Sequence, residues 1–205
     1  LLLVDGKHLF GHTALYLNLR SGNSISDLIA HAGALDPRLV KQAAVKHSSG
    51  VHVLPSPSEI TQAQGIRPED LFKVIQGLKS TYPYIVVDGG NHMDENTVTY
   101  LDASDKILRV RTADLAAMRD ARQFLDIAAS LGYPAEKTLL VVNQAGRKAE
   151  IKRGEIEVVL KMILFGTIPA DEDLALASLN EGVPIVLKKA RHPISRAYNK
   201  LTKEL

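Results

Sequence analysis

The chain has 205 residues, 45% hydrophobic and 23% charged, which is typical of one soluble α/β domain with a sizeable core. Its 25 Lys and Arg residues against 23 Asp and Glu leave a net charge of +2, too small to indicate nucleic-acid binding by itself. The absence of cysteine excludes disulfides, thiolate zinc sites and a cysteine nucleophile, and is compatible with a reducing cytoplasm. We expect a single domain over 1–205.

Short apolar runs rich in Val, Ile and Leu alternate with longer helical patterns along the chain. Several runs are continuously hydrophobic, as strands buried on both faces of a parallel sheet must be. The alternation predicts an α/β fold with a doubly wound, mostly parallel sheet and helices on both faces. The runs predicted as strands are 1–4, 51–54, 84–88, 106–110, 139–143, 165–168 and 184–187.

Two stretches between the first strands have helical features. Residues 54–68 contain two prolines near their start, which predicts a loop followed by a short helix. Residues 69–81 place apolar side chains at i, i+3, i+4 and i+7, which predicts a helix with one stripe on the sheet. The residues of this stripe are Leu71, Val74, Ile75 and Leu78.

Two further helices have recognisable ends. One is predicted to begin after Asp114, whose carboxylate can cap it, and to end at Gly132. The residues expected to face inward from this helix are Leu115, Met118, Ala121, Leu125 and Ala128. The other follows Asp171 and ends at Gly182, and we expect it to lead directly into the strand at 184–187.

Polar residues follow several predicted strands, at the edge where open α/β sheets bind ligands. Asp88 is followed by Gly89 and Gly90, which is the form of a Walker B motif. There the carboxylate orders the water shell of a magnesium ion, while the glycines let backbone approach a phosphate. The other strand-end residues are Asp5, Asn143, Pro169 and Asp171. Taken singly, these residues are also typical of turns or helix N-caps.

Other kinds of site have little support. His8 and His12 are four residues apart, but Gly6 and Gly11 make that stretch a loop, so we expect no metal-binding pair. No apolar run approaches the ~18 residues of a membrane-spanning helix.

Six segments, in this order, carry a family resemblance: "LLLVDGKHLFGHTALYLNL", "GVHVLPSP", "YIVVDGG", "RTADLAAMRDARQFLDIAASLGYP", "LLVVNQAGRKAEI" and "TIPADEDLALASLNEGVPI". Together they resemble the MinD/ParA superfamily of deviant P-loop ATPases. They are most similar to its CpaE/TadZ branch, the pilus-assembly localisation proteins. The resemblance covers essentially the whole chain.

The resemblance implies an ATP and magnesium site. Asp5 matches the switch I aspartate and Asp88 the Walker B carboxylate, so both are candidate catalytic residues that hold magnesium through water. Asn143 matches the asparagine that reads adenine, and "IPAD" matches the loop that closes over the base. The implied nucleotide-binding residues are Gly89, Gly90, Asn143, Ile168, Pro169, Ala170 and Asp171.

The resemblance also implies a homodimer. The helix that begins "TADLAAMRDAR" lies, in relatives, near the face that two subunits use to enclose two ATP molecules. Thr112, Asp114 and Arg119 are therefore candidate dimer contacts, with ordinary surface polar residues as the alternative interpretation.

The chain departs from the family at two places. No G-x-x-x-x-G-K-[ST] segment or deviant form occurs in the 205 residues, and we expect the P-loop before residue 1. Lys7 stands where relatives carry a second switch carboxylate, and His12 where CpaE-like chains often have Asp. A lysine cannot position an attacking water as a carboxylate does. We expect weak or absent hydrolysis, and whether the chain is an ATPase stays open.

The favoured hypothesis is an ATP-binding, dimerising localisation or assembly factor for a type IVb (Flp/Tad) pilus or secretion apparatus. Its expected partners are a second copy and pilus or secretion assembly proteins. Its expected location is the cytoplasm, at a cell pole or at a membrane through those partners. The nucleotide would then select a conformational state rather than supply energy.

Three alternatives remain. A ParA-like partition ATPase would bind DNA through basic residues, which are Arg147, Lys148, Lys152, Arg153, Lys188, Lys189, Arg191, Arg196, Lys200 and Lys203. We do not favour this, because such clusters are usually solvated faces. A MinD-like membrane-binding C-terminal helix is disfavoured because the tail is poor in Phe and Trp. The last alternative is a scaffold without nucleotide.

Overall fold

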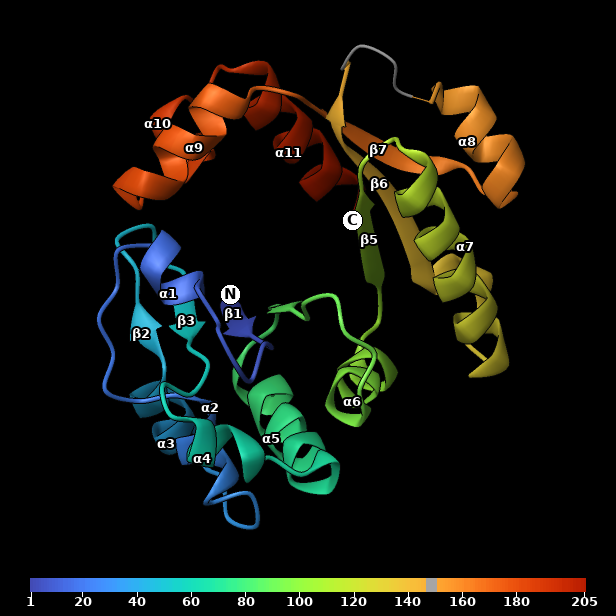
Figure 1. Cartoon of the computed structure of the whole chain (residues 1–205). Coiled ribbons are helices and arrows are strands. Elements are labelled where there is room, and N and C mark those ends of the chain that lie inside the picture. The colour runs from blue at the N-terminus through green and yellow to red at the C-terminus, as the bar shows by residue number, and fades with distance from the viewer. Residues whose placement is uncertain (147–150) are drawn as a thin grey trace. The chain divides into compact units, whose positions relative to one another are not determined.

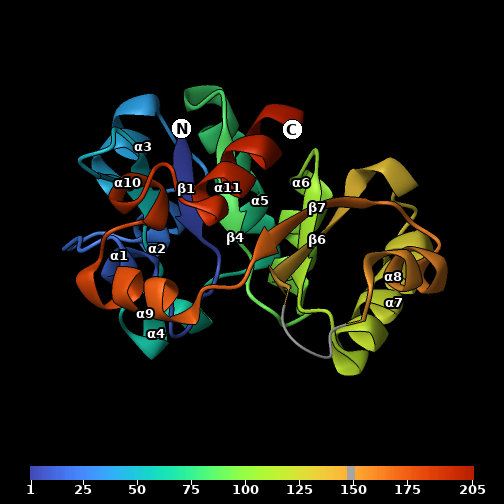
Figure 2. The ribbon, with the colours of Figure 1, turned by 90° about the horizontal axis from the view of Figure 1, so that it is seen from above.

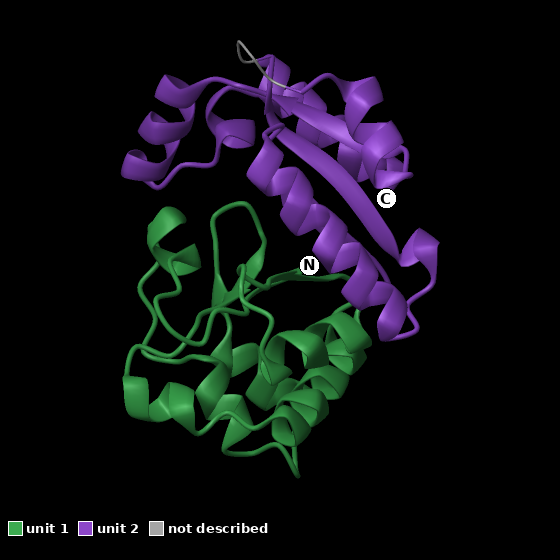
Figure 3. Cartoon of the chain, turned by 45° about the vertical axis from the view of Figure 1, so that its right-hand side comes forward, with its two compact units in different colours: residues 1–104 green, residues 105–205 purple. Residues whose placement is uncertain are grey.

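The computed structural model of the chain describes residues 1–146 and 151–205 (Figure 1). The chain divides into two compact units, residues 1–104 and 105–205, which Figure 3 colours separately. Both units contain a sheet with helices packed on it, and each is described by itself below. Their sheets are mostly parallel, which confirms the predicted α/β fold class. The single domain over 1–205 stays a prediction.

Unit 1 is built on a four-stranded sheet with the order β2-β3-β1-β4. β1 pairs in parallel with β3 and with β4, whereas β2 is antiparallel to β3. β2 has only two residues and was not expected from the sequence, since so short a run shows no periodicity. The elements are β1 Leu2–Asp5, α1 Thr13–Tyr16, α2 Ile25–Ile29, α3 Pro37–Ala43, β2 Val45–Lys46, β3 His52–Leu54, α4 Ile60–Gln64, α5 Pro68–Thr81, β4 Ile85–Asp88 and α6 Glu95–Ala103.

The core of unit 1 lies between β1 and helix α5. Leu2 and Val4 of β1 are fully buried in one cluster with the apolar stripe of α5. The predicted stripe of Leu71, Val74, Ile75 and Leu78 is confirmed, since all four are buried. The predicted loop and short helix at 54–68 are confirmed by α4.

Unit 2 is built on a three-stranded parallel sheet with the order β5-β6-β7. α7 and α8 contact each other, and α11 contacts β7. The elements are β5 Ile107–Arg111, α7 Leu115–Ser130, a short 3-10 helix Ala135–Lys137, β6 Thr138–Ala145, α8 Arg153–Leu160, β7 Leu164–Pro169, α9 Glu172–Glu181, α10 Ile185–Lys188 and α11 Pro193–Glu204.

Helices cover both faces of the unit 2 sheet. Leu140 and Val142 of β6 share a buried cluster with residues of α7 and α8. Val141 points to the opposite face, because side chains alternate along a strand, and packs with Ile194 and Leu201 of α11. Figure 2 shows α7 and α8 on one side of β6 and β7 and α11 on the other. The predicted layering is therefore present in this sheet.

β4 is one end strand of the unit 1 sheet and β5 is one end strand of the unit 2 sheet, and both carry exposed apolar side chains. Val86 of β4 is half exposed, and Leu108 and Val110 of β5 are exposed to a similar degree. The prediction that several runs are buried on both faces is not tested for these two, because each lies at an end of the sheet of its own unit.

The predicted strand at 184–187 is wrong, because Ile185–Lys188 form helix α10. Pro184 precedes the helix with a φ of −55°, which suits a helix start. None of the α10 residues is buried, although the apolar residues of this run suggested a buried strand. A short apolar run cannot be assigned to strand or helix from periodicity alone.

Helix α7 follows the predicted ends but not the whole predicted face. Asp114 caps it by accepting a bond of 2.9 Å from the backbone N–H of Ala117, and Gly132 follows its end with a φ of +77°. The residues that pack inward as predicted are Met118, Ala121, Leu125 and Ala128. The prediction for Leu115 is wrong, since its side chain is 81% exposed. It is the first helical residue, so its side chain points back beyond the helix rather than onto the sheet.

Within the two described ranges, no helix combines the length and the apolar character needed to cross a membrane.

Met118 and Leu115 provide a test of this helix face. We expect Met118→Ala to lower the free energy of unfolding by about 2–4 kcal/mol, because it empties a buried position. The control Leu115→Ala removes an exposed side chain one turn away and should change it by less than about 0.5 kcal/mol. Urea denaturation followed by circular dichroism measures both. Equal losses in the two variants would contradict the described orientation of α7.

Candidate functional site

The two predicted magnesium carboxylates lie side by side in unit 1. β1 and β4 run in parallel with Asp5 and Asp88 as direct partners in the register. Both residues are the last of their strands, so their side chains start at the same edge of the sheet. The two strand-end carboxylates are therefore neighbours, and their role as a magnesium pair stays a prediction.

The Asp5 carboxylate is hydrogen-bonded by the loop that follows β1. Its side chain is buried, and its Oδ1 and Oδ2 accept bonds from the backbone N–H groups of Lys7 at 3.3 Å and Thr13 at 3.0 Å. Gly11 lies against this carboxylate, where an added Cβ would clash with Asp5 Oδ2 and with the Ser56 side chain. Asp5 thus closes the loop over residues 6–13, and Gly11 makes room for it.

Asp88 forms an ion pair with Lys7. The Lys7 Nζ donates to Asp88 Oδ2 at 2.9 Å, and the two side chains are 36% and 48% exposed. The hydrogen bond to Asp88 is the main reason that the pKa of Lys7 is raised above its ordinary value, so the ammonium stays charged. Lys7 stands where a switch carboxylate was expected, and its ammonium binds the other predicted magnesium carboxylate, Asp88.

Gly90 gives the Lys7 side chain its path to Asp88. Gly90 has a φ of +69°, a conformation that favours glycine, and a Cβ there would lie 3.2 Å from the Cγ of Lys7. Gly89 has open space at the same point. The sequence predicted that both glycines let backbone approach a phosphate. In this structure Gly90 accommodates the lysine stem.

These contacts limit how a magnesium ion fits. Magnesium requires near-octahedral oxygen coordination and keeps several waters. Both Asp5 oxygens accept backbone N–H groups, so Asp88 Oδ1 is the oxygen of the pair outside the bonds described above. Over residues 1–146 and 151–205 no three His, Asp or Glu side chains are grouped to hold a metal. Asp88 Oδ1 is therefore the more open oxygen for a hydrated ion, while each Asp5 oxygen keeps a second lone pair that can accept a magnesium-bound water.

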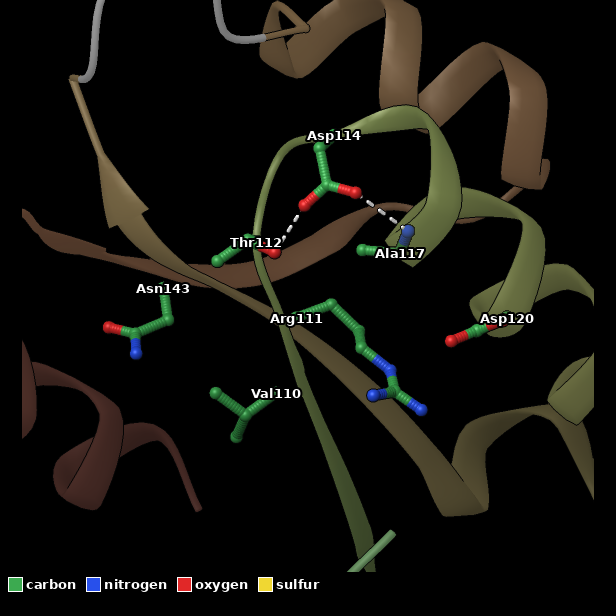
Figure 4. Close-up of a pocket in the computed structure, with 7 residues that line it drawn as sticks. All are labelled: Val110, Arg111, Thr112, Asp114, Ala117, Asp120 and Asn143. Carbon is green, nitrogen blue, oxygen red and sulfur yellow. Dashed lines mark hydrogen bonds between the residues drawn. The ribbon is translucent and has the colours of Figure 1, made fainter.

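In unit 2 the predicted adenine-reading residue, Asn143, lines a cavity of about 330 Å³ at the end of β5 and β6 (Figure 4). Its other lining residues are Val110, Arg111, Thr112, Asp114, Ala117 and Asp120. Two of the predicted dimer contacts, Thr112 and Asp114, therefore share a cavity with Asn143.

Thr112 and Asp114 are tied to each other. The Thr112 hydroxyl donates to Asp114 Oδ2 at 2.5 Å, while Oδ1 caps α7. The bond from Thr112 is the main cause that lowers the pKa of Asp114. Both thus hold the start of α7, whereas Arg119 lies exposed further along that helix.

The segment 168–171 is joined to the end of β6. Pro169 pairs with Ala145, and the backbone N–H of Ala170 donates to the Ala145 carbonyl at 3.0 Å. Ile168 is buried, and Asp171 caps α9 through the N–H of Leu174 at 3.0 Å. Because Asn143 lies two residues before Ala145, this segment and Asn143 lie at the same end of one sheet.

His192 has a role at this end that the sequence did not indicate. Its Nε2 lies 3.2 Å from Asp171 Oδ2, and its Nδ1 accepts from the N–H of Ile194 at 3.3 Å. The tautomer with hydrogen on Nε2 satisfies both contacts. His192 therefore links the start of α11 to the start of α9. A histidine just before a proline was the only signal for it.

Two arginines on β5 were also missed. Arg109 lies over the Phe124 ring, 4.0 Å from its centroid, and burial lowers the pKa of Arg109 to about 10. Arg111 lines the cavity, and its buried Nε makes no hydrogen bond within the described part of the chain. The two arginines are two positions apart in the strand, so both side chains face α7. This alternation was the available sequence signal.

Sequence comparison finds relatives that span much of the chain. No protein-family model matches it. An uncharacterized ATP-binding protein of Methanocaldococcus jannaschii is 29% identical over 166 residues, 79% of this chain and 61% of that protein. The septum site-determining protein MinD of Thermotoga maritima is 25% identical over 173 residues, 80% of this chain and 62% of that protein. The chain spans about three fifths of the length of these relatives.

Solved structures match the fold. A ParA family ATPase from Chlorobium tepidum has a TM-score of 0.90 at 26% identity and covers 99% of this chain and 84% of that one. The septum site-determining protein MinD of Pyrococcus horikoshii, in complex with Mg-ADP, has a TM-score of 0.84 at 21% identity. That match covers 99% of this chain and 82% of the other, and at this identity it shows the fold alone.

Alanine variants of Gly90 and Gly89 test the described environment of Lys7. We expect Gly90→Ala to lower the free energy of unfolding by about 1–2 kcal/mol, because alanine disfavours a positive φ. Gly89→Ala is the matched control, with open space for the added methyl group, and should have a smaller effect. Urea denaturation without nucleotide measures both. A Gly89→Ala loss as large as that of Gly90→Ala would contradict the described loop.

The Asp5 bonds give a second test of the loop. Asp5→Ala leaves the buried N–H of Thr13 and the N–H of Lys7 without their acceptor, so we expect a loss of about 2 kcal/mol. Asp126→Ala is the control, because it removes only an exposed carboxylate paired with Arg122, and should cost less than about 0.5 kcal/mol. Thermal or urea unfolding without metal or nucleotide measures both. An Asp5→Ala variant as stable as the control would show that the carboxylate does not hold the loop.

Proposed function

We propose a function for this chain on the premise that it is a MinD/ParA-type P-loop NTPase, as its relatives and fold support. In this proposal the protein binds ATP with magnesium, dimerises and acts as a localisation or assembly factor, with weak or absent hydrolysis. The observation that carries it is the in-register pair of Asp5 and Asp88 at the carboxyl ends of neighbouring parallel strands. That edge is where open α/β sheets bind their ligands.

Within unit 2, the nucleotide part of the proposal rests on Asn143 and the segment 168–171. Asn143 and the segment 168–171 lie at one end of the unit 2 sheet, which suits contact with a base. The Asn143 amide carries both a donor and an acceptor, as adenine recognition needs. Within unit 1 taken by itself, we propose that Asp88 and the adjoining Gly89 contact phosphate and magnesium.

Magnesium would supply charge neutralisation to the nucleotide phosphates. Asp88 would hold it through water, with Oδ1 as the acceptor. Asp5 would act indirectly, by fixing the loop that carries Lys7. Both residues were predicted as catalytic, and this arrangement favours positioning roles for them rather than activation of an attacking water.

The finer proposal is a role in assembling a type IVb (Flp/Tad) pilus or a secretion apparatus. It rests on the resemblance of the six segments to the CpaE/TadZ branch and on Lys7 at the switch position. A factor that marks a position needs the nucleotide only to favour one conformational state, so slow hydrolysis is compatible with it. We propose that it works in the cytoplasm, at a pole or at a membrane through its partners.

The dimer is proposed through the face that includes Thr112, Asp114 and Arg119. The first two are fixed at the start of α7, and a rigid polar pair costs little conformational entropy when it contacts a partner. Arg119 is exposed on the same helix and free to approach a second copy.

The ParA-like alternative has one specific support, the structural match to a ParA family ATPase. Its predicted basic residues include Arg147 and Lys148, which lie outside the described residues. Among the others, Lys188 pairs with Glu181 at 2.6 Å and Arg153 with Glu157 at 2.9 Å, which reduces their net attraction for phosphate. We therefore keep DNA binding as the second candidate, marked by a steep salt dependence.

Direct membrane binding is not proposed. Ile194 and Leu201 of α11 are buried against Val141 and Ile168 of the unit 2 sheet. Part of the apolar face of this helix is thus already used within the chain.

ATP titration tests the proposal. We expect ATP with magnesium to raise the melting temperature and to shift sedimentation from monomer to dimer. Asn143→Ala should weaken ATP binding about 2- to 10-fold, the equivalent of one lost hydrogen bond. Asn180→Ala, on the exposed side of α9, is the matched control and should bind as the native protein does. An unchanged melting temperature at millimolar ATP would favour the scaffold alternative.

A further inference from the structure

The ion pair of Lys7 and Asp88 has more anchors than an ordinary surface pair. The backbone N–H of Lys7 is bound to Asp5, its stem lies against Gly90, and its ammonium contacts Asp88 at 2.9 Å. A lysine on a surface usually loses side-chain entropy when it pairs, which cancels much of the gain. Here the loop has already fixed much of the side chain, so the pair should persist.

The ammonium also changes the charge of this strand edge. Asp5 and Asp88 would together present two negative charges to a divalent cation. Lys7 contributes one positive charge within hydrogen-bond distance of Asp88, and its nearby charged or titratable neighbours are Asp5, Asp88 and Tyr16. The edge therefore offers a net single negative charge, and one of the Asp88 oxygens is already bound.

We propose that Lys7 is a tethered cation that occupies Asp88 in place of part of the hydration shell of a divalent metal ion. It weakens metal binding at this edge and makes nucleotide binding less dependent on magnesium. A metal ion that approaches Asp88 must displace the ammonium or accept a single open oxygen. The part of this inference that concerns nucleotide binding rests on the proposed function. The competition between Lys7 and a metal ion for Asp88 can be measured without nucleotide.

Manganese binding to the intact, nucleotide-free protein tests the competition. Electron paramagnetic resonance measures free Mn²⁺ as protein is added at pH 7. We expect weak binding by the native protein and about three- to tenfold tighter binding by Lys7→Met, which keeps the length of the stem without its charge. Lys188→Met is the matched control, because it removes an ion pair with Glu181 far from Asp88 in the sequence, and should bind as the native protein does.

A double variant assigns the gain to Asp88. Adding Asp88→Asn to Lys7→Met should return Mn²⁺ affinity to the native level or below. If Lys7→Met binds Mn²⁺ no more tightly than the native protein, or if the double variant keeps the gain, the proposal is overturned. Lys7→Gln provides a second neutral replacement should Lys7→Met fold poorly, as judged by its urea midpoint.

A nucleotide titration then tests the second half of the proposal. The ratio of ATP affinities with and without Mg²⁺ should be several-fold larger in Lys7→Met than in the native protein. An equal ratio in both would overturn this half. If no variant binds ATP but the Mn²⁺ results hold, the proposed function fails and the competition stands. If ATP binds but Lys7→Met leaves Mn²⁺ binding unchanged, the function stands and the competition fails.

Discussion

The buried carboxylate of Asp5 is the contact on which the arrangement of unit 1 depends. It ends a core strand, and its two oxygens accept backbone N–H groups from the loop that follows. An unpaired carboxylate at this depth would be costly, so the loop must close on it. Closure sets the position of Lys7, and the parallel register of β1 and β4 places Asp88 where the lysine reaches it. One buried group thereby determines what the strand edge offers to a ligand.

Much of this could be predicted from the sequence, because the signals are local. The stripe of α5, the cap of α7 at Asp114 and the stop at Gly182 each depend on residues within one or two turns. The strand-end positions of Asp5 and Asp88 were equally visible, since an apolar run that ends in Asp needs no knowledge of its partner strand. The parallel pairing that joins them follows from the predicted fold class.

The rest depended on contacts between residues distant in sequence. The four residues of α10 suit a strand as well as a helix, and tertiary packing determines how exposed their side chains are. Leu115 has the right spacing for the core, but its place at the helix start turns it outward. The bond of Lys7 to Asp88 joins residues 81 positions apart, and the partnership of His192 with Asp171 also forms only in the folded chain. The hydrophobic periodicity of the sequence carries no information about such pairs.

The replacement of a carboxylate by lysine can be understood as a change in what the site stabilises. A second carboxylate beside Asp5 would strengthen the hold on a metal ion and could orient a water for attack. A lysine bonded to Asp88 neutralises charge permanently and offers no base. The pair leaves one net negative charge at the strand edge, from Asp5, and one Asp88 oxygen outside the ion pair. In the function proposed above, such a site suits a positional marker, for which the nucleotide selects a conformational state and need not be hydrolysed.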